Sequence, residues 1–329
     1  MRILITGAAG FLGSNLAGFL LARGDKVIAL DDLSTGRKDN IKEHLTNDNF
    51  TFVEADVCEP YHFEVDQIYN LACPASPPHY QRDPIKTTMT CVMGTKNALD
   101  LARKTNATVL QASTSEVYGD PECHPQDESY RGNVNPIGPR SCYDEGKRVA
   151  ESLCFDYQRY HGVKIKVARI FNTYGPKMRA DDGRVISNMI VAALNAKPLT
   201  VYGDGSQTRS FCYVDDLVGG LAAVMNETGT SGPYNVGNPD ERTVLEVAEI
   251  IKQRLDPTLA IANLDLPEDD PRQRCPDITR LTSETGWKPT TDFATGLGLT
   301  LAYFEQLKQP GFDGERITKT DRNTMWGNL

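Results

Sequence analysis

The chain has 329 residues, of which 40% are hydrophobic and 24% are charged. This length is enough for one large core or two lobes, and the balanced composition excludes a disordered or coiled-coil chain. The net charge of −9 argues against nucleic acid or an anionic membrane as the main partner, so any anionic ligand must meet a local basic cluster.

Cysteine usage and the first residues bear on location. The eight cysteines are scattered, with no CxxC pair and no metal-ligand spacing, so we predict reduced thiols and no metal site. The chain opens on a short apolar run that breaks at Gly7, too short for the core of a signal peptide. No stretch approaches the roughly 20 apolar residues of a membrane span. We therefore expect a cytoplasmic protein with no membrane partner.

Short apolar runs rich in β-branched residues alternate with helical patterns through the first half of the chain. Helical spacing covers Phe11–Arg23, Pro84–Lys104 and Ser141–Tyr160. This alternation predicts right-handed βαβ units and an α/β fold with a doubly wound parallel (Rossmann) sheet. The predicted strands are Arg2–Thr6, Lys26–Leu30, Phe50–Val53, Gln67–Leu71, Thr108–Gln111 and Val163–Ile170.

The texture changes after Gly175, where glycine and proline become frequent. We predict a Rossmann domain over residues 1–175, with a returning segment at about 208–237. A smaller C-terminal α/β lobe for the substrate would comprise residues 176–207 and 238–308, followed by a polar tail over 309–329. The elements expected after Gly175 are strands Leu199–Tyr202, Ser210–Tyr213 and Tyr234–Val236 and helices near Ile186–Asn195 and Thr243–Leu255.

A glycine motif links the first strand to the first helix. Gly7, Gly10 and Gly13 stand between them, and Asp31 closes the next strand 18 residues after Gly13. Glycines let the backbone approach a pyrophosphate at the helix N-terminus, and the aspartate accepts hydrogen bonds from a ribose. The alternative is an ordinary βα turn. Asp31 would repel a 2′-phosphate and so favours NAD over NADP, and we interpret Arg37 and Lys38 as a solvated loop.

Tyr143 and Lys147 form a Tyr-x-x-x-Lys pair on one face of a predicted helix. A phenol that takes a proton from a sugar hydroxyl near neutral pH needs a lowered pKa, and a neighbouring ammonium favours the phenolate. By itself such a pair is often only a solvated helix face. Thr114 ends the fifth strand, at the carboxyl edge where doubly wound sheets bind ligands, and its hydroxyl can bridge Tyr143 and a substrate oxygen. The alternative there is a polar strand end.

Four longer stretches resemble one family. They indicate the UDP-glucuronic acid decarboxylases, or UDP-xylose synthases, within the extended short-chain dehydrogenase/reductase superfamily, and the resemblance covers residues 1 to about 307. Departures are Cys73, where the family often has serine, and Arg131 and Asn133, where tryptophan and histidine are common. The stretches are Ala72–Pro78, Ser113–Pro121, Asn135–Arg148 and Arg169–Pro176.

The residues after Thr114 narrow the reaction that the resemblance implies. Nucleotide-sugar 4,6-dehydratases carry Thr-Asp-Glu where this chain has Thr114-Ser115-Glu116, and 4-epimerases usually have a small residue at the position of Glu116. The implied activity is decarboxylation of UDP-glucuronate to UDP-xylose with a retained NAD. The alternatives are a UDP-glucuronate 4-epimerase, another NAD-dependent nucleotide-sugar epimerase or dehydratase, and a catalytically idle NAD-sensing scaffold.

The resemblance also implies roles for individual residues. Tyr143 takes the C4 hydroxyl proton while the C4 hydride passes to NAD, and the 4-keto sugar then loses carbon dioxide. We hypothesise that Glu116 positions the leaving carboxylate or the water that protonates C5. The implied catalytic residues are Thr114, Ser115, Glu116, Tyr143 and Lys147. The implied cofactor-binding residues are Gly7, Gly10, Phe11, Leu12, Gly13, Asp31, Asp32, Ser34, Thr35, Gly36, Asp56, Val57, Leu71, Ala72, Tyr143 and Lys147.

Arginines in the second lobe are candidates for the diphosphate, because guanidinium forks match phosphate oxygens. An isolated arginine is as often a surface charge. The implied substrate-binding residues are Asn172, Thr173, Arg184, Val185, Tyr202, Gln207, Arg209, Arg272 and Arg274. In the family, the helices within 84–104 and 141–160 pair in a homodimer as a four-helix bundle, although a face buried within one chain would look the same.

Overall fold

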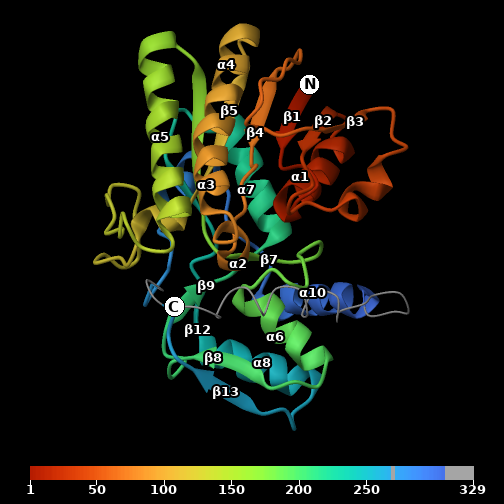
Figure 1. The fold of residues 1–329 in the computed structure, drawn as a ribbon, viewed down its shortest axis with the longest axis vertical. Helices are drawn as coiled ribbons and strands as arrows, with labels where there is room; N and C mark the ends of the chain where they lie inside the picture. The colour runs from red at the N-terminus through yellow and green to blue at the C-terminus, as the bar shows by residue number, and fades with distance from the viewer. Residues whose placement is uncertain (268–270, 308–329) are drawn as a thin grey trace.

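The computed structural model describes residues 1–267 and 271–307, and its largest element is a seven-stranded parallel sheet. The strand order is β11-β6-β5-β4-β1-β2-β3. Helices cover both faces of this sheet (Figure 1), which confirms the predicted doubly wound α/β fold. The strands are β1 (Arg2–Thr6), β2 (Lys26–Asp31), β3 (Phe50–Glu54), β4 (Gln67–Asn70), β5 (Thr108–Thr114), β6 (Lys164–Ile170) and β11 (Tyr234–Val236).

The strands are apolar on both sides because each side packs on helices. Ile3 and Ile5 join the core formed with α1 and α7, whereas Leu4, between them, joins the core formed with α4 and α5. The helices of this part are α1 (Phe11–Ala22), α2 (Pro77–Tyr80), α3 (Pro84–Met89), α4 (Thr95–Thr105), α5 (Ser141–His161) and α7 (Val214–Asn226), with 3₁₀ turns at Lys38–His44 and Ser115–Tyr118.

The single helix predicted over Pro84–Lys104 is wrong in one respect. The chain forms α3, then a π-helical segment at Thr90–Gly94, and then α4. Gly94 lies so close to the loop after β3 that a β-carbon there would come within 2.9 Å of Val57. The wider turn accommodates this approach, and π-helical turns are frequent at functional sites.

The smaller lobe lies below the sheet in Figure 1. Among the described residues, two short strand pairs lie in the lobe and a third lies at its border with the sheet. The predicted strand Ser210–Tyr213 is divided in the structure, because its two halves pair with different partners. One half pairs with β12 in the lobe, and the other pairs with β7 beside the sheet domain. The elements are α6 (Val185–Leu194), β7 (Thr173–Tyr174), β8 (Leu199–Tyr202), β9 (Thr208–Ser210), β10 (Cys212–Tyr213), β12 (Glu241–Thr243), α8 (Val244–Leu255), β13 (Ile261–Leu264), α9 (Thr279–Thr285) and α10 (Phe293–Leu307).

One hydrophobic core continues from the sheet into the lobe. The Tyr174 ring contacts both Tyr213 and Phe293, the latter at the start of α10, and Leu297 continues the cluster into the lobe. This shared core fixes the lobe against the sheet. The predicted domain division stays a prediction, although α9, within the range assigned to the lobe, packs on β11 and α7 of the sheet. The predicted tail over 309–329 lies outside the described residues. None of the described helices is both long enough and apolar enough to cross a membrane.

The turn between β1 and α1 gives a test of the fold. Gly13→Ala places a methyl group 2.2 Å from the Gly7 carbonyl oxygen, so we expect the free energy of unfolding to fall by about 1–3 kcal/mol. Gly18→Ala, in the same helix, meets only the His44 side chain at 3.4 Å and should be neutral or stabilising by up to ~1 kcal/mol. Urea unfolding of both variants measures the difference. Equal effects at the two positions would contradict the packing described.

Candidate active site

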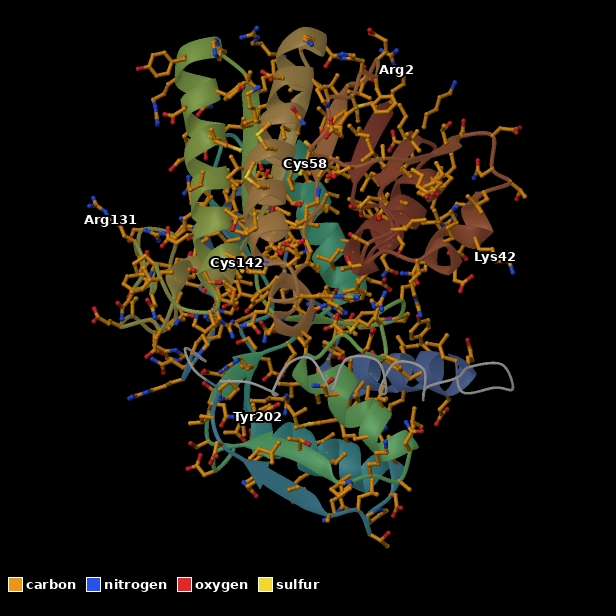
Figure 2. All side chains as sticks on the ribbon, in the orientation of Figure 1. Arg2, Lys42, Cys58, Arg131, Cys142 and Tyr202 are labelled. Atoms are coloured by element: carbon orange, nitrogen blue, oxygen red, sulfur yellow. The ribbon has the colours of Figure 1, made fainter. Side chains whose placement is uncertain are left out.

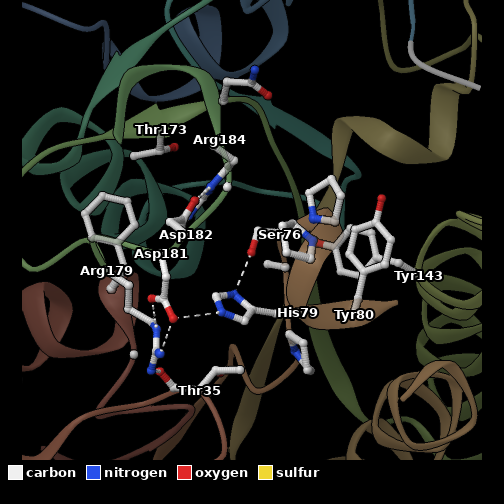
Figure 3. Close-up of a pocket in the computed structure, with 18 of the residues that line it drawn as sticks. Thr35, Ser76, His79, Tyr80, Tyr143, Thr173, Arg179, Asp181, Asp182 and Arg184 are labelled. Atoms are coloured by element: carbon white, nitrogen blue, oxygen red, sulfur yellow. Dashed lines mark hydrogen bonds and ion pairs between the residues drawn. The ribbon is translucent and has the colours of Figure 1, made fainter. Parts of the chain in front are cut away.

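A cleft of about 1930 Å³ lies between the sheet and the lobe, at the carboxyl ends of β1, β2, β4, β5 and β6. In open α/β sheets, ligands bind at this edge. The cleft is larger than the few hundred to 1,000 Å³ typical of a single small ligand, so it has room for a dinucleotide and a nucleotide sugar together. Figure 3 shows part of its wall, with side chains from both the sheet domain and the lobe.

The glycine turn at one end of the cleft has no space for side chains. Gly7 has a left-handed φ of +70°, and a β-carbon on it would lie 2.9 Å from the Ala72 Cα. A β-carbon on Gly13 would collide with the Gly7 carbonyl oxygen, because α1 packs closely against the turn at this point. The backbone at this turn is therefore open to a ligand that approaches the start of α1.

The N-terminus of α1 is suited to an anion. No side chain caps its N-terminal residue, Gly10, and no acidic side chain lies in its first turn. The first amides of the 12-residue helix therefore point to the cleft with the positive end of the helix dipole behind them. These observations fit the pyrophosphate of a dinucleotide.

Asp31 lies beside this turn and is buried. Its carboxylate accepts backbone N–H groups from Ala9 at 2.9 Å and Leu33 at 2.8 Å, and it lines the cleft. Burial raises the pKa of this carboxyl, and the two amides oppose the shift. Arg37 is not the solvated residue that we predicted, because it donates to Tyr303 of α10 at 2.9 Å. Lys38 pairs with Glu54 at 2.8 Å and is exposed.

Helix α5 carries Tyr143 and Lys147 into the cleft from the other side. Both side chains are buried, and the Lys147 ammonium lies 5.6 Å from the centre of the Tyr143 ring. Lys147 donates to the carbonyl oxygen of Ala112 on β5 at 2.9 Å, which fixes its position. The Tyr143 ring stacks on Tyr80 of α2, with centroids 5.1 Å apart and planes 2° from parallel. Figure 3 shows the two rings face to face.

The electrostatics of Tyr143 differ from the prediction. Burial raises the pKa of the phenol well above its usual value, and the Cys73 and Cys91 thiols add to the shift. A hydrogen bond with the Thr114 side chain opposes it. Among the protein's own groups, burial outweighs any effect of the Lys147 ammonium on this pKa. The phenol needs a further positive charge beside it to act as a base.

A buried network holds α5 on the sheet. Glu151 of α5 accepts from the Ser113 hydroxyl of β5 at 2.5 Å and pairs with Arg169 of β6 at 2.8 and 2.9 Å. The Arg169 guanidinium also lies over the Tyr118 ring and donates to its hydroxyl at 3.0 Å. These contacts fix the register of α5, and with it the position of Tyr143, relative to the end of β5.

The turn after β5 brings three polar groups to the cleft. The Thr114 hydroxyl accepts the Glu116 amide at 3.2 Å and caps the short 3₁₀ turn. The Glu116 carboxylate lies between two guanidinium groups, with Arg140 at 2.6 Å and Arg274 at 3.2 Å. Arg274 is only 2% exposed, and it also donates to the Ser115 hydroxyl at 3.0 Å and the Gly119 carbonyl at 2.9 Å.

We call these three side chains the Glu116–Arg140–Arg274 triad. The two arginines favour the ionised form of Glu116. Burial raises the pKa of its carboxyl, but Arg274 and Arg140 outweigh burial and hold that pKa at about 2. The next carboxyl along, Asp144, has its pKa raised to about 8 by burial and by the Glu116 charge. Two guanidinium groups and one carboxylate give the triad a net charge of +1, and all three side chains line the cleft. The triad can therefore receive an anionic group.

The lobe supplies further polar side chains to the cleft. Arg184 pairs with Asp182 at 2.8 Å and lies over the Phe11 ring. Arg209 is buried and donates to the Thr208 carbonyl at 2.8 Å, and its charge also lowers the pKa of Glu116. Tyr202, which is half-exposed, lies on the lobe (Figure 2) at the rim of the cleft.

A group of hydrogen bonds and ion pairs along the cleft wall connects α2, the lobe and the loop after β2. The Arg179 guanidinium makes two hydrogen bonds of 2.7 Å to the two oxygens of the Asp181 carboxylate. It also donates to the Thr35 carbonyl oxygen at 3.2 Å. His79 lies 3.8 Å from the Asp181 carboxylate and bonds to the Ser76 hydroxyl at 2.8 Å. Figure 3 shows this set of contacts, which joins segments far apart in the chain.

Most of the predicted site residues line this one cleft, but three do not. The Asp56 carboxylate pairs with the Lys86 ammonium and accepts the Cys58 amide. Gly36 packs against the Asp31 carboxylate. Arg272 is exposed, with its backbone amide bonded to Asp120. The predicted residues that line the cleft are Gly7, Gly10, Phe11, Leu12, Gly13, Asp31, Asp32, Ser34, Thr35, Val57, Leu71, Ala72, Thr114, Ser115, Glu116, Tyr143, Lys147, Asn172, Thr173, Arg184, Val185, Tyr202, Gln207, Arg209 and Arg274.

Sequence reasoning missed Arg140 and Tyr80 as parts of the site. Each lies in a stretch that we quoted or next to one, but no spacing rule connects Arg140 to Glu116 or Tyr80 to Tyr143. A group of possible metal ligands, His124, Glu241 and Cys275, was also invisible to spacing because its members are far apart in the chain. Their ligand atoms lie within 4.8 Å of one another, and the His124 imidazole and the Glu241 carboxylate contact each other at 3.1 Å.

Comparison with known proteins agrees with this geometry. The model of the NAD dependent epimerase/dehydratase family matches residues 3–237. UDP-glucuronic acid decarboxylase 5 of Arabidopsis thaliana is 55% identical over 300 residues, covering 91% of this chain and 88% of the relative. UDP-glucuronic acid decarboxylase 1 of Danio rerio is 52% identical over 318 residues, covering 97% and 76%.

Among solved structures, the UDP-glucuronic acid 4-epimerase of Bacillus cereus, in complex with UDP-glucuronic acid and NAD, superposes with a TM-score of 0.83. The sequence identity is 28%, and the match covers 93% of this chain and all of that chain. The identity to the decarboxylases is about twice as high, and it extends beyond the family model into the lobe. The chain belongs to the NAD dependent epimerase/dehydratase family and, within it, to the UDP-glucuronic acid decarboxylases.

Proposed function

We propose that this protein converts UDP-glucuronate to UDP-xylose and carbon dioxide, with NAD as a cofactor that is regenerated in each cycle. The family assignment supports this reaction. The observation in the structure that carries it is the Glu116–Arg140–Arg274 triad, a cationic cluster in which Glu116 lies on the turn after Thr114 and which lines the same cleft as Tyr143. A neutral hexose has no charged group that could pair with these arginines, whereas glucuronate has its C6 carboxylate.

The first half of the reaction prepares the carboxylate for loss. NAD, when bound, would supply a hydride acceptor for C4 that is regenerated in each cycle, and its oxidised ring would add the positive charge that favours the Tyr143 phenolate. Tyr143 takes the C4 hydroxyl proton, and the Thr114 hydroxyl holds the same oxygen in place. Lys147, anchored on the Ala112 carbonyl, keeps a positive charge near the phenol. The resulting sugar has a ketone at C4 and a carboxylate β to it.

The second half is the decarboxylation itself. The C5–C6 bond breaks, carbon dioxide leaves, and the electron pair moves onto the C4 oxygen, where the Tyr143 and Thr114 hydroxyls stabilise it. C5 then takes up a proton. Because Arg140 and Arg274 hold the pKa of Glu116 well below its usual value, we assign Glu116 as a carboxylate and not as the acid. We therefore assign it to orienting the substrate carboxylate, through its arginines, and the water that supplies the C5 proton.

The roles of the remaining site residues are part of the same proposal. The cradle around Gly7 would hold the cofactor pyrophosphate, and Asp31 the adenosine ribose. Arg209, at the lobe side of the cleft, is proposed for the substrate diphosphate. Arg274 was predicted to bind that diphosphate, but its contacts with Ser115 and Glu116 favour the carboxylate end of the substrate instead.

A 4-epimerase acting on UDP-glucuronate is the second candidate, since the Bacillus cereus 4-epimerase shares the fold. The triad alone does not separate the two, because both reactions bind the same anionic sugar. The higher identity to decarboxylases favours loss of carbon dioxide. A dehydratase is disfavoured because Ser115, held by Arg274 at 3.0 Å, is a poor substitute for an acidic side chain. The complete Thr114, Tyr143 and Lys147 set argues against an idle NAD sensor.

Product analysis tests the proposal. Purified protein with NAD and UDP-glucuronate should release carbon dioxide and give a UDP-pentose with the NMR spectrum of UDP-xylose. Tyr143→Phe keeps the ring stacked on Tyr80 but removes the proton acceptor, so its turnover should fall on the order of 10²- to 10⁴-fold. A UDP-hexuronate product with no carbon dioxide would establish the 4-epimerase instead, and no product from intact protein would favour the sensor.

The triad makes a separate prediction about Glu116. Glu116→Gln retains the shape of the side chain but removes the charge between the two arginines, so kcat should fall on the order of 10²-fold or more, with a smaller change in KM. Glu145→Gln, on α5, changes a carboxylate that pairs with the half-buried Arg148 at 3.5 Å and does not line the cleft, and it should behave as the parent protein. Initial-rate kinetics measure both. Full turnover by a folded Glu116→Gln protein would remove Glu116 from the mechanism.

We also propose that the protein is a homodimer that pairs through α3 and α5. Ile85 and Met89 stand one turn apart on α3 and are 77% and 43% exposed, and Val149 on the adjacent α5 is 42% exposed. Apolar side chains gathered on packed helices favour a partner surface. We further propose a cytoplasmic location, supported by the free thiols of all eight cysteines.

The dimer proposal predicts the effect of a charge on α3. Ile85→Glu should convert a particle of twice the chain mass into one of the single chain mass, because the carboxylate would be buried in the pair. Leu299→Glu, also on an exposed apolar residue but on α10, should leave the dimer intact. Light scattering after gel filtration measures both. A parent protein of single chain mass would rule the dimer out.

A further inference from the structure

Two thiols that the proposed reaction does not use touch each other beside the catalytic helix. Cys73 follows β4 and lines the cleft, and Cys91 lies in the π-helical segment between α3 and α4, where it is 2% exposed. Their sulfur atoms are 3.3 Å apart. Cys73 is also the position at which the chain departs from the serine that is common in the family.

The thiol pair lies against the helix that carries Tyr143 and Lys147. A β-carbon on Gly146, between those two residues, would lie 3.0 Å from the Cys91 sulfur. Both thiols raise the pKa of Tyr143, which shows that their charges reach the phenol. The loop that carries Cys73 continues from Ala72, which packs on the Gly7 turn. The pair therefore connects the wall of the cofactor cradle to the catalytic helix.

The contact between the sulfurs also sets their protonation. Either S–H can donate in this contact, and a hydrogen bond from Cys73 lowers the pKa of Cys91 to about 7, with the Lys147 ammonium acting in the same direction. The pKa of Cys73 is raised correspondingly. An ordinary thiol has a pKa of about 8.5, so the pair favours a thiolate on Cys91 more than an isolated cysteine does. A thiolate in contact with a second sulfur is the starting point of disulfide chemistry.

We propose that Cys73 and Cys91 are a redox modification site, which a hydroperoxide entering the cleft converts to a disulfide that inactivates the enzyme reversibly. The Cys73 sulfur, which faces the cleft, attacks one peroxide oxygen while the buried Cys91 thiolate takes the Cys73 proton. The O–O bond breaks, and the leaving hydroxide takes that proton from Cys91 and departs as water. The Cys91 thiolate then attacks the sulfenic acid on Cys73, the S–S bond forms, and the hydroxide released takes a proton from solvent to become the second water. Two thiols and one hydrogen peroxide give one disulfide and two waters.

The disulfide would distort the site because the sulfurs must come closer. An S–S bond is about 2.05 Å long, so the two atoms move together by roughly 1.2 Å. Cys91 lies directly under Gly146, and Cys73 lies on the cleft wall, so the shift displaces the turn of α5 beside Tyr143 or the loop beside the cofactor cradle. Misplacement of reacting groups by about 1 Å can cost on the order of 10²-fold in rate.

The experiment treats the full-length protein, with NAD present, with hydrogen peroxide, blocks the remaining thiols and maps the peptides by mass spectrometry. We expect a linked Cys73–Cys91 peptide, at least a tenfold loss of pentose formation, and recovery of both with dithiothreitol. Only the activity measurement rests on the proposed function. If untreated protein forms no pentose, the proposed function fails, whereas peptide mapping still shows whether the disulfide forms.

Two serine variants make the assignment specific. Cys91→Ser should match the parent before treatment and keep its activity in peroxide. Cys142→Ser removes a thiol at the start of α5 (Figure 2), where the sulfur contacts the Tyr80 carbonyl oxygen at 3.7 Å, and should stay as sensitive as the parent. The proposal is overturned if the linked peptide does not form in the parent protein, if oxidised parent protein keeps its activity, or if folded Cys91→Ser is inactivated equally fast. If Cys91→Ser does not fold, the mapping and activity of the parent protein decide.

Discussion

The buried carboxylate of Glu116, held between Arg140 and Arg274, is the interaction on which the site depends. It joins three segments: the turn after β5, the residues before α5, and the chain returning from the lobe. Removing one partner of a buried ion pair costs about 3–5 kcal/mol, because the other charge stays buried. The same contact therefore closes the lobe onto the sheet and leaves one net positive charge for the substrate. The overall charge of −9 obscures this cluster, which is too local to affect the whole-chain balance.

Catalysis also requires that Tyr143 on α5 and Thr114 at the end of β5 keep their positions relative to each other. Ser113, Glu151 and Arg169 fix α5 across two strands, and Lys147 ties it to the Ala112 carbonyl. Such contacts hold reacting groups to the tolerance that catalysis demands. They also explain why a small movement at Cys91 would reach the chemistry, since α5 is rigid where it meets that thiol.

Features set by local sequence were predictable, and features set by long-range contacts were not. The Gly7–Gly13 turn and β1 follow from local conformational needs, so their limits agree with the structure. Helix α7, which we did not predict, contains Gly219 and Gly220, which lower its helix propensity, and most of its residues are buried in the core. The break at Thr90–Gly94 and the partners of Arg140 arise from residues far along the chain. The raised pKa of Tyr143 likewise depends on burial, which spacing does not show.

The central claim is that the protein breaks the C5–C6 bond after oxidising C4 and then restores both carbons without releasing the intermediate. Running the reaction in D₂O and recording the proton spectrum of the product tests this most directly. The account predicts a UDP-xylose with one deuterium at C5, taken from solvent, and with the original hydrogen at C4. Deuterium at C4, or a hexuronate that retains its carboxylate, would contradict it.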